Sequence, residues 1–415
     1  MSRSRWSLAV LLVLVAAGAS HSQTASAQPG LLHTSDAQRR LYLGSAAVWA
    51  ARDTPTPAEI LAGPVARNPL RGIALTPAGE LECTYLNGGA GAAGRTEKFT
   101  CRTAEGRTVR VKYYDGNPKS GNREVFAEVV STRLFWALGF DADAMFPVVV
   151  QCSDCPENPN SGKGPRARRR FLGVVEAFYE GTIIASTANT DQGWGFAEVS
   201  SAIDALPAGP DKDRQRTHFD ALTLLAVFVQ HGDRKPSQQR LVCVGPLDLA
   251  KGDLHAEDDD NGFHLPVLFE RAGAAACDAT RVTVQDLGAT MGGAGYITRA
   301  SSKVSLASWA KVEVFAGPRR TSGICRGRLA VAAGAGSQAG GDLPISESGR
   351  RFLFERLSTL TPDHIRALFD AARVGELDEP QEWKDAGGAV HSGIDGWVAA
   401  FADKVAQVGR RRCES

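Results

Sequence analysis

The chain has 415 residues, of which 43% are hydrophobic, enough to build a substantial core in one large two-lobed domain or in two domains. Its 47 basic and 46 acidic residues leave a formal net charge of +1. Because no overall field attracts polyanions, we expect neither nucleic acid nor an anionic lipid surface as a partner.

The N-terminus has the organisation of a secretory signal peptide. Arg3 and Arg5 precede a short apolar run, and an Ala-x-Ala site ends at Ala27. The apolar run has about a dozen residues, whereas a membrane-spanning helix needs roughly 20. We predict a cleaved signal peptide over residues 1–27, a secreted or periplasmic chain, and no transmembrane span after cleavage. An uncleaved N-terminal anchor is the alternative.

The eight cysteines all follow this segment, which is typical of an oxidising compartment in which they can pair. The C-x-x-C motif at residues 152–155 has neither the thioredoxin-like context of a redox motif nor the second ligand pair of a zinc site. Structural disulfides are therefore favoured. Cys83 and Cys101 flank a predicted hairpin, and Cys243–Cys277 and Cys325–Cys413 are further hypothesised pairs, but the sequence does not fix the connectivity.

Residues 28–80 are predicted to form a helical extension, with helices over 36–51 and from Pro57. Three runs rich in β-forming residues follow and predict consecutive antiparallel strands. The next segment has apolar residues at helical spacing and stops at Gly139, a residue suited to a helix C-cap. Another strand-like run follows. The strand-like runs are 81–86, 97–103, 107–114 and 146–152, and we assign residues 81–152 to one lobe.

A loop rich in Asn, Gly, Pro and Arg, residues 153–170, is predicted to separate this lobe from a second one. Its basic run at 166–170 is interpreted as solvated. Residues 171–375 form the second lobe, which contains an apolar helix ending near His231, an insertion at 245–281, and a helix capped by Thr361. Residues 376–415 are a C-terminal extension.

The first motif that points to chemistry is a glycine-rich stretch between the first two predicted strands. Gly89, Gly91 and Gly94 make G-x-G-x-x-G. A dinucleotide-binding fingerprint would continue into a helix, but a strand follows here. A glycine-rich hairpin also lets backbone N–H groups approach phosphates, which is its use in kinases. A flexible hairpin tip is the alternative reading.

A lysine and two glutamates come next. Lys112 lies on the third predicted strand, where such a residue more often points to solvent than to a phosphate. The following helix carries Glu124 and Glu128 on one face. One of them is expected to pair with Lys112 and hold its ammonium against the α- and β-phosphates of a nucleotide. We favour Glu128, which lies deeper in the helix.

Two loops complete the series. His231, Asp233 and Gln238 align with the histidine, aspartate and final position of H-R-D-x-x-x-x-N. In that pattern Asp233 would accept the proton of an attacking hydroxyl, and residue 238 would give a side-chain oxygen to a metal. Asp286, which begins Asp-Leu-Gly after a strand-like run, would bind the metal that bridges the phosphates.

With these motifs in this order, the chain resembles the protein-kinase-like superfold over roughly residues 80–375. It looks closest to atypical branches: HipA-like and spore-coat CotH-like bacterial proteins, the secreted Fam20 kinases and the phosphoinositide kinases. It is also similar to exported bacterial proteins in the segments that read here KFTC, VKYY, TRLFWALGF, DRKPSQQRLVC and DLGATMG. The resemblance implies an α+β fold with two lobes, a small antiparallel-sheet N-lobe and a mainly helical C-lobe, stabilised by disulfides.

The resemblance further implies a phosphotransferase that uses ATP or another nucleotide with Mg or Mn. The acceptor, whether protein, sugar or small molecule, is not indicated. The chain departs from the pattern in having no A-P-E segment and in carrying Gln238 where asparagine is expected. Glutamine has the same amide oxygen as asparagine on a longer side chain, so it could still bind a metal. The same replacement would also be found in a protein that has lost the activity. A catalytically inactive kinase-like module that binds an envelope ligand or partner is therefore the alternative, and nucleotidyl transfer a third hypothesis.

Overall fold

The structure is a computed structural model. The residues that it describes are 30–89, 96–114, 116, 123–177, 181–186, 193–232, 234–258, 264–271, 274–292, 304–317, 323–329, 342–377 and 381–413. The predicted signal peptide, two glycines of the glycine-rich stretch (Gly91 and Gly94) and the predicted base Asp233 lie outside the described residues.

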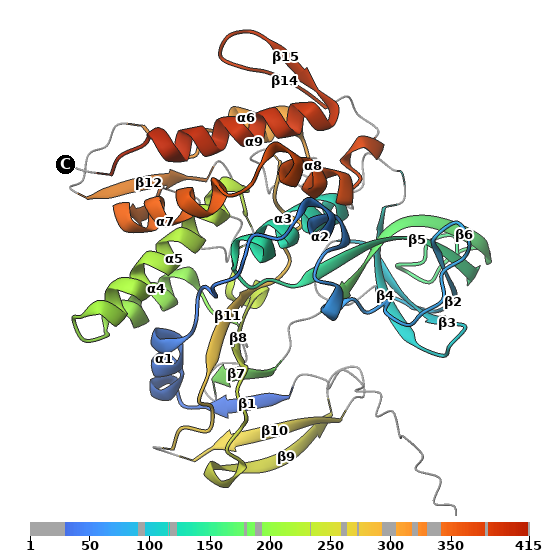
Figure 1. Cartoon of the computed structure of the whole chain (residues 1–415). Coiled ribbons are helices and arrows are strands. Elements are labelled where there is room, and N and C mark those ends of the chain that lie inside the picture. The colour runs from blue at the N-terminus through green and yellow to red at the C-terminus, as the bar shows by residue number, and fades with distance from the viewer. Residues whose placement is uncertain are drawn as a thin grey trace, which may run out of the picture.

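Five strands close into a barrel in the order β2-β3-β4-β6-β5 (Figure 1). They are β2 (Glu80–Gly88), β3 (Lys98–Thr103), β4 (Thr108–Tyr114), β5 (Ala144–Cys155) and β6 (Ala167–Ala177). Neighbouring strands are antiparallel except β2 and β5, which pair in parallel and close the barrel. The predicted strands are thus present, but the expectation of a purely antiparallel sheet was wrong, because the closing pair joins strands that are distant in sequence.

The loop at 153–170 does not separate two lobes. It connects β5 to β6, which pair with each other from Ala144–Ala177 to Cys155–Ala167. The proline- and glycine-rich composition that suggested a boundary here belongs to a long hairpin connection. The basic run at its end enters β6, where Arg168 and Arg170 form ion pairs with Glu82 and Glu80 of β2. The chain leaves the barrel only after β6.

A second, six-stranded sheet has the order β11-β8-β7-β1-β10-β9. Its strands are β1 (Leu31–Thr34), β7 (Thr182–Ser186), β8 (Gln239–Cys243), β9 (Gly252–Asp258), β10 (His264–Glu270) and β11 (Thr280–Val284). β1 pairs in parallel with both β7 and β10. The part of the chain after the barrel thus combines helices with this sheet, and one strand of the sheet comes from the N-terminal segment that was expected to be helical.

The helices gather beside the barrel and at one end of this sheet (Figure 1). They are α1 (Asp36–Ser45), α2 (Pro57–Ala62), α3 (Glu124–Leu138), α4 (Phe196–Asp204), α5 (Pro210–Phe228), α6 (Leu306–Lys311), α7 (Glu347–Leu357), α8 (Pro362–Ala371) and α9 (Gly393–Arg410). Two hairpins accompany them, β12 (Ile324–Arg328) with β13 (Asp342–Ser346) and β14 (Glu382–Lys384) with β15 (Val390–Ser392).

Several helix ends follow from local chemistry. α8 begins with Thr361 at the N-cap and Pro362 at the first helical position, as predicted. α3 ends at Gly139, whose φ of +89° favours glycine. A Cβ on Gly139 would lie 2.5 Å from the Ala50 carbonyl oxygen, so the N-terminal segment can pass this helix end only because no side chain is there.

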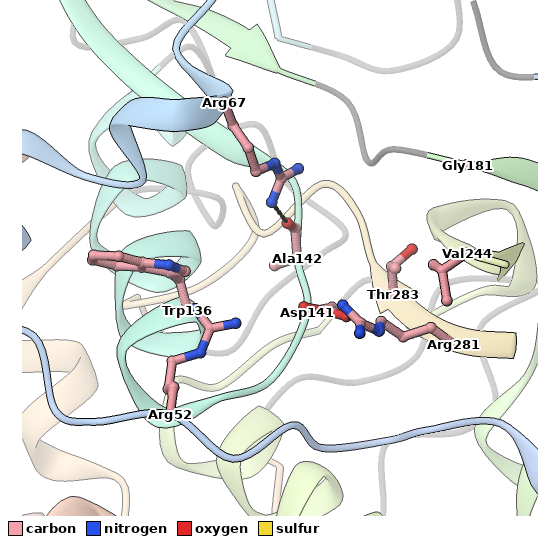
Figure 2. A pocket seen from close by; sticks show the side chains of 9 residues that line it. All are labelled: Arg52, Arg67, Trp136, Asp141, Ala142, Gly181, Val244, Arg281 and Thr283. Atoms are coloured by element: carbon pink, nitrogen blue, oxygen red, sulfur yellow. Dashed lines mark hydrogen bonds and ion pairs between the residues drawn. The ribbon is translucent and has the colours of Figure 1, made fainter. Parts of the chain in front are cut away.

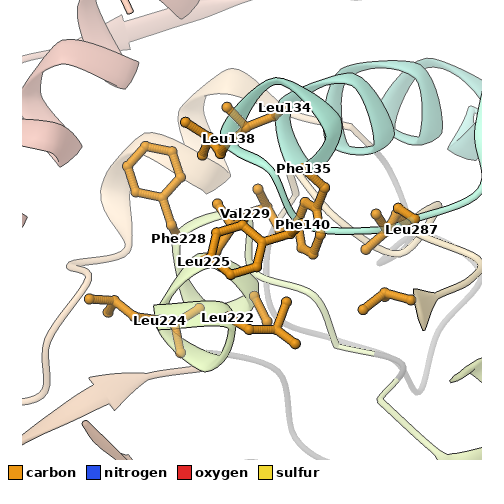
Figure 3. Packing of buried hydrophobic residues seen from close by; sticks show 14 of the residues in the cluster. Leu134, Phe135, Leu138, Phe140, Leu222, Leu224, Leu225, Phe228, Val229 and Leu287 are labelled. Atoms are coloured by element: carbon orange, nitrogen blue, oxygen red, sulfur yellow. The ribbon is translucent and has the colours of Figure 1, made fainter. Parts of the chain in front are cut away.

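The largest hydrophobic core lies around α3 and α5. α3 is buried along almost its whole length. Near its C-terminal end it packs against the end of α5, and Leu287 of the Asp-Leu-Gly segment joins the same cluster (Figure 3). Burial of large apolar side chains contributes about 1.5–3 kcal/mol each, so this cluster fixes three segments that carry predicted site residues.

All four hypothesised cysteine pairs are present as disulfides: Cys83–Cys101, Cys152–Cys155, Cys243–Cys277 and Cys325–Cys413. The first two lie in the barrel, and the last joins the C-terminal end to β12. In the described part of the chain, no helix combines the length and the apolar character that crossing a membrane requires.

Candidate functional site

The centre of the candidate site is a buried ion pair between β4 and α3. Lys112 is 7% exposed, and its Nζ lies 2.8 Å from Oε1 of Glu128, which is fully buried. A second carboxylate, Glu176 of β6, lies 3.4 Å from the same Nζ. Glu124, one turn earlier on α3, instead accepts a hydrogen bond from the Thr96 hydroxyl. Glu128 is therefore the partner of Lys112, as favoured from the sequence, and the lysine does not point to solvent.

A second lysine lies directly opposite Lys112. Lys98 of β3 is its register partner across the β3–β4 ladder and is 4% exposed. Burial lowers the pKa of Lys98, and the nearby charges of Arg110 and Lys112 lower it further. Lys98 could not be identified from the sequence, because a lysine in a short strand of alternating residues has the pattern of a solvent-facing one.

Gly89, the first glycine of the glycine-rich stretch, packs against this second lysine. Its N–H donates to the carbonyl oxygen of Lys98 at 2.9 Å. A Cβ on Gly89 would lie 2.2 Å from Lys98 Cγ, a distance that no real contact reaches. Glycine at this position therefore allows the two strands to approach where Lys98 is buried. Whether the stretch contacts phosphates stays a prediction.

The Asp-Leu-Gly segment is held against α3 at the level of the ion pair. Asp286 follows β11 with a left-handed φ of +46° and is partly buried. A Cβ on Gly288 would lie 2.9 Å from Glu124 Cβ and 3.2 Å from Glu128 Oε1, so glycine is needed for this close contact. Two residues later, the Thr290 hydroxyl lies 2.7 Å from that of Ser131 on α3. These contacts bring Asp286 beside the Lys112–Glu128 pair.

Backbone hydrogen bonds join the loop after α5 to this segment. Gly232 N donates to the Ala289 carbonyl at 3.2 Å, and Met291 N donates to Val229 at 2.8 Å. Further along, Gln285 N donates to the carbonyl of Gln238 at 2.8 Å. Gln238, which ends a short 3-10 helix (Pro236–Gln238), is thus attached to the residue that precedes Asp286. This backbone hydrogen bond links the segments that carry the two predicted metal ligands, Gln238 and Asp286.

The electrostatics divide the carboxyl groups of the site into two kinds. Burial alone would lower the pKa of Lys112, but Glu128, Glu176 and Asp286 hold it well above its ordinary value, so Lys112 remains an ammonium. Burial raises the pKa of Asp286, but Lys112, together with Glu128, outweighs it and leaves the pKa below its ordinary value. Glu128 behaves oppositely, because burial and the charges of Asp286 and Glu176 raise its pKa. Asp286 is therefore the carboxyl group whose ionised form this site favours most.

Another acidic residue, Asp143, lies deep beside this cluster. It precedes β5, is 1% exposed, and neither carboxyl oxygen has a hydrogen-bond partner among the described residues. Burial, followed by the charge of Glu176, raises its pKa to about 8. Lys112 is among the charges that oppose this rise. Asp143 was also missed from the sequence, although an aspartate between apolar residues in "GFDADAMF" was a usable signal.

The residues present fit a divalent cation held mainly by a nucleotide. Asp286 is an ionised carboxylate, and Glu128 Oε2 is buried with no hydrogen-bond partner among the described residues. The described residues contain no group of three or more His, Cys, Asp or Glu side chains placed to bind a metal. A magnesium–nucleotide site does not require such a group, since one or two protein ligands and the phosphates suffice. Asp286 and Gln238 are the residues that would hold the ion.

No family model and no curated protein matches the chain. Among solved structures, it is similar to the Helicobacter pylori proinflammatory kinase CtkA, with 10% sequence identity, a TM-score of 0.36, and coverage of 80% of this chain and 94% of that one. A likeness this distant carries no weight for function, which has to be judged from the residues themselves.

Proposed function

We propose that the chain is a kinase-like phosphotransferase that transfers a phosphoryl group from a metal-bound nucleotide, ATP with Mg or Mn. In this proposal the barrel is the smaller of two lobes. The observation that carries the proposal is the buried Lys112–Glu128 ion pair, with its Nζ–Oε1 distance of 2.8 Å, beside Asp286. The acceptor remains unspecified.

A purely structural ion pair explains this cluster less well. Taking charged groups out of water costs several kcal/mol per ion, so a buried pair is weak evidence for stability alone. Here two lysines and three carboxyl groups from five segments are gathered together, and the pKa values of neighbouring carboxyl groups are driven apart. Such separation is typical of sites that hold charged ligands or move protons.

Each residue has a role in the proposal. Lys112 binds the α- and β-phosphates, and Glu128 positions its ammonium. Asp286 and Gln238 hold the metal ion, which neutralises charge on the phosphates when bound. Asp233 accepts the proton of the attacking hydroxyl. Gly89, Gly91 and Gly94 cover the phosphates with backbone N–H groups.

Gln238 favours a second candidate, a kinase-like module that binds a ligand or partner without turnover. Glutamine carries its amide oxygen one methylene further from the backbone than asparagine, and the backbone of Gln238 is tied to Gln285 at 2.8 Å. A backbone held in place leaves less freedom to compensate for the longer side chain. The two candidates differ in turnover and share the nucleotide or ligand site.

The first experiment is a thermal-shift titration of oxidised, signal-free protein with ATP, with and without Mg or Mn. The phosphotransferase proposal requires stabilisation that depends on the metal and is lost in Asp286→Ala. The matched control is Asp370→Ala, which changes an exposed aspartate on α8. If no metal-dependent stabilisation is seen, the nucleotide proposal is wrong and the binding module is favoured.

Label transfer separates the enzymatic hypotheses. Transfer from γ-labelled ATP indicates a phosphotransferase, whereas transfer from α-labelled ATP indicates nucleotidyl transfer. Activity of Asp233→Ala at the wild-type rate would exclude Asp233 as the base. Gln238→Asn restores the asparagine that the kinase pattern has at this position. A higher rate of label transfer in this variant would indicate a wild-type site that is active but weakened by glutamine.

We also propose that the protein is exported. Four disulfides are compatible with an oxidising compartment. The test is expression of the full chain in a bacterium, followed by fractionation and mass spectrometry of the mature N-terminus. Cleavage after Ala27 and recovery outside the cytoplasm are expected, whereas a chain that keeps residue 1 and stays in the cytoplasm would contradict the proposal.

A further inference from the structure

A pocket of about 330 Å³ lies apart from the Lys112 site, and none of the described residues of that site lines it. Its described walls come from the segments before and after α2, the C-terminal part of α3 and the turn after it, single residues beside β7 and β8, and the strand β11 (Figure 2). On β11, Arg281 and Thr283 line the pocket, while the alternate residues Val282 and Val284 are buried in the core. The pocket therefore opens on the side of this strand that faces away from the core.

Positive charge dominates the pocket. Among the described residues that line it are three arginines, Arg52, Arg67 and Arg281, and one carboxylate, Asp141. Arg281 is paired with Asp141, with 2.9 Å between Nε and Oδ2. Since that pair is neutral, the described lining residues carry a net positive charge from the other two guanidinium groups.

The other two arginines differ in what holds them. Arg67 donates to the main-chain carbonyl oxygens of Ala142, at 2.9 Å, and Ala177, at 3.3 Å, which fixes its side chain along the wall of the pocket. Arg52 has its guanidinium 5.9 Å from the centre of the Trp136 ring. Its Nε is buried with no hydrogen-bond partner among the described residues.

The arrangement is costly without a ligand. Burial lowers the pKa of Arg52, and the neighbouring charges of Arg281 and Arg67 act in the same direction while Asp141 opposes them. Half-buried guanidinium groups that repel one another are stabilised by a bound anion. Arginine is the residue best suited to a phosphate group, because its planar fork of N–H donors matches the phosphate oxygens.

We propose that this pocket binds the phosphate group of a small molecule between Arg52 and Arg281, with the rest of the molecule beside Trp136. The volume is at the lower end of the range for small-molecule sites, about 300–1,000 Å³, which suits a ligand the size of a sugar phosphate. Arg67 contributes charge from a side chain already held in place. This site is separate from the proposed phosphotransferase site and does not depend on it.

The experiment is isothermal titration of the oxidised, signal-free protein with glucose 6-phosphate, inorganic phosphate and glucose at matched ionic strength. Saturable binding of a phosphate-containing probe, with none of glucose, is expected. Tighter binding of glucose 6-phosphate than of inorganic phosphate by tenfold or more supports a phosphorylated molecule. Equal affinity would identify free phosphate as the ligand of the same arginines. No saturable binding of either probe at millimolar concentration would overturn the proposal.

Variants assign the binding to this pocket. Arg52→Gln is expected to weaken it at least tenfold, and since Arg52 donates no hydrogen bond to the described residues and is repelled by its neighbours, the thermal midpoint of the ligand-free protein should not fall. The matched control is Arg168→Gln, which changes an exposed arginine on the barrel. Unchanged affinity in Arg52→Gln would refute the assignment.

A further variant distinguishes the two sites. Asp286→Ala, which is expected to abolish nucleotide binding, should leave glucose 6-phosphate affinity as it is. Binding that is lost in Asp286→Ala but kept in Arg52→Gln would place the phosphate at the Lys112 site instead. If nucleotide binding fails altogether while the Arg52-dependent binding persists, the proposed function is wrong and this inference stands.

Discussion

Asp143→Asn is expected to stabilise the protein, and more strongly as the pH rises. The wild-type carboxyl group is 1% exposed and has no hydrogen-bond partner among the described residues. Asparagine has nearly the same shape and cannot ionise, so the variant removes the titration of residue 143 and little else.

The magnitude follows from the proton affinity of the buried group. Burial raises the pKa of Asp143 from 3.8 to about 8. The folded protein thus keeps a proton that the unfolded chain has released, and the free energy of unfolding falls as the pH rises from about 4 to about 8. At 1.36 kcal/mol for each tenfold change in proton affinity, the full effect is at most about 6 kcal/mol. Because relaxation and water entry reduce such penalties, we expect about 2–4 kcal/mol at pH 8.

The assay is urea unfolding of metal-free protein at pH values from 4.5 to 8.5, comparing the wild type with Asp143→Asn. The two should be equal within about 1 kcal/mol at the lowest pH and diverge above it. Asp370→Asn, at an exposed aspartate on α8, should show no such divergence. A difference that is the same at every pH, or a variant less stable at pH 8 than at pH 4.5 relative to wild type, would refute the reasoning.

Three further predictions concern stability. Lys112→Met should lower the free energy of unfolding by about 3–5 kcal/mol, because fully buried Glu128 loses its counter-ion; the double variant with Glu128→Leu should lose less than the single one in urea unfolding. Gly288→Ala should cost about 1–3 kcal/mol and weaken any nucleotide binding, because its Cβ would lie 2.9 Å from Glu124 Cβ. Gly317→Ala, whose Cβ meets no described residue within 4 Å, is its control in both assays. Replacing the Cys325–Cys413 disulfide by two serines should lower stability by about 2–5 kcal/mol, measured under oxidising conditions, since it closes an 88-residue separation. If the unfolding midpoint of one of these three variants is unchanged, the contact that it removes or disturbs does not contribute to stability as predicted.

Local signals were enough to predict several elements. The three strands of the first hairpins, the helix that stops at Gly139 and the helix that begins at Pro362 were all expected from their residues. The choice of Glu128 over Glu124 was also correct. The strands and helices depend on chemistry within a few residues, which the sequence displays directly. The cysteine pairs that were suggested are present, but eight cysteines allow 105 pairings, so the sequence alone did not determine them.

Other features depend on partners that are distant along the chain. The sequence does not show that residues 31–34 pair with β7 and β10, that β2 closes on β5, or that residues 153–170 join two strands of one barrel. A four-residue strand has too few side chains to show the alternation of apolar and polar residues that is typical of strands. A loop has the same composition whether it separates two lobes or connects the strands of a hairpin.

The same limit applies to the charged clusters. A lysine or glutamate in a strand has the same local pattern whether it faces water or the interior, so Lys98 and Glu176 could not be distinguished from solvent-facing residues before the barrel was known. Two of the pocket arginines flank α2 and the third lies on β11, so they meet only in the tertiary structure. The sequence by itself determined the order of the motifs and their local structure. The tertiary structure decided which charges are buried together, because burial depends on the packing of segments that the chain brings together from far apart.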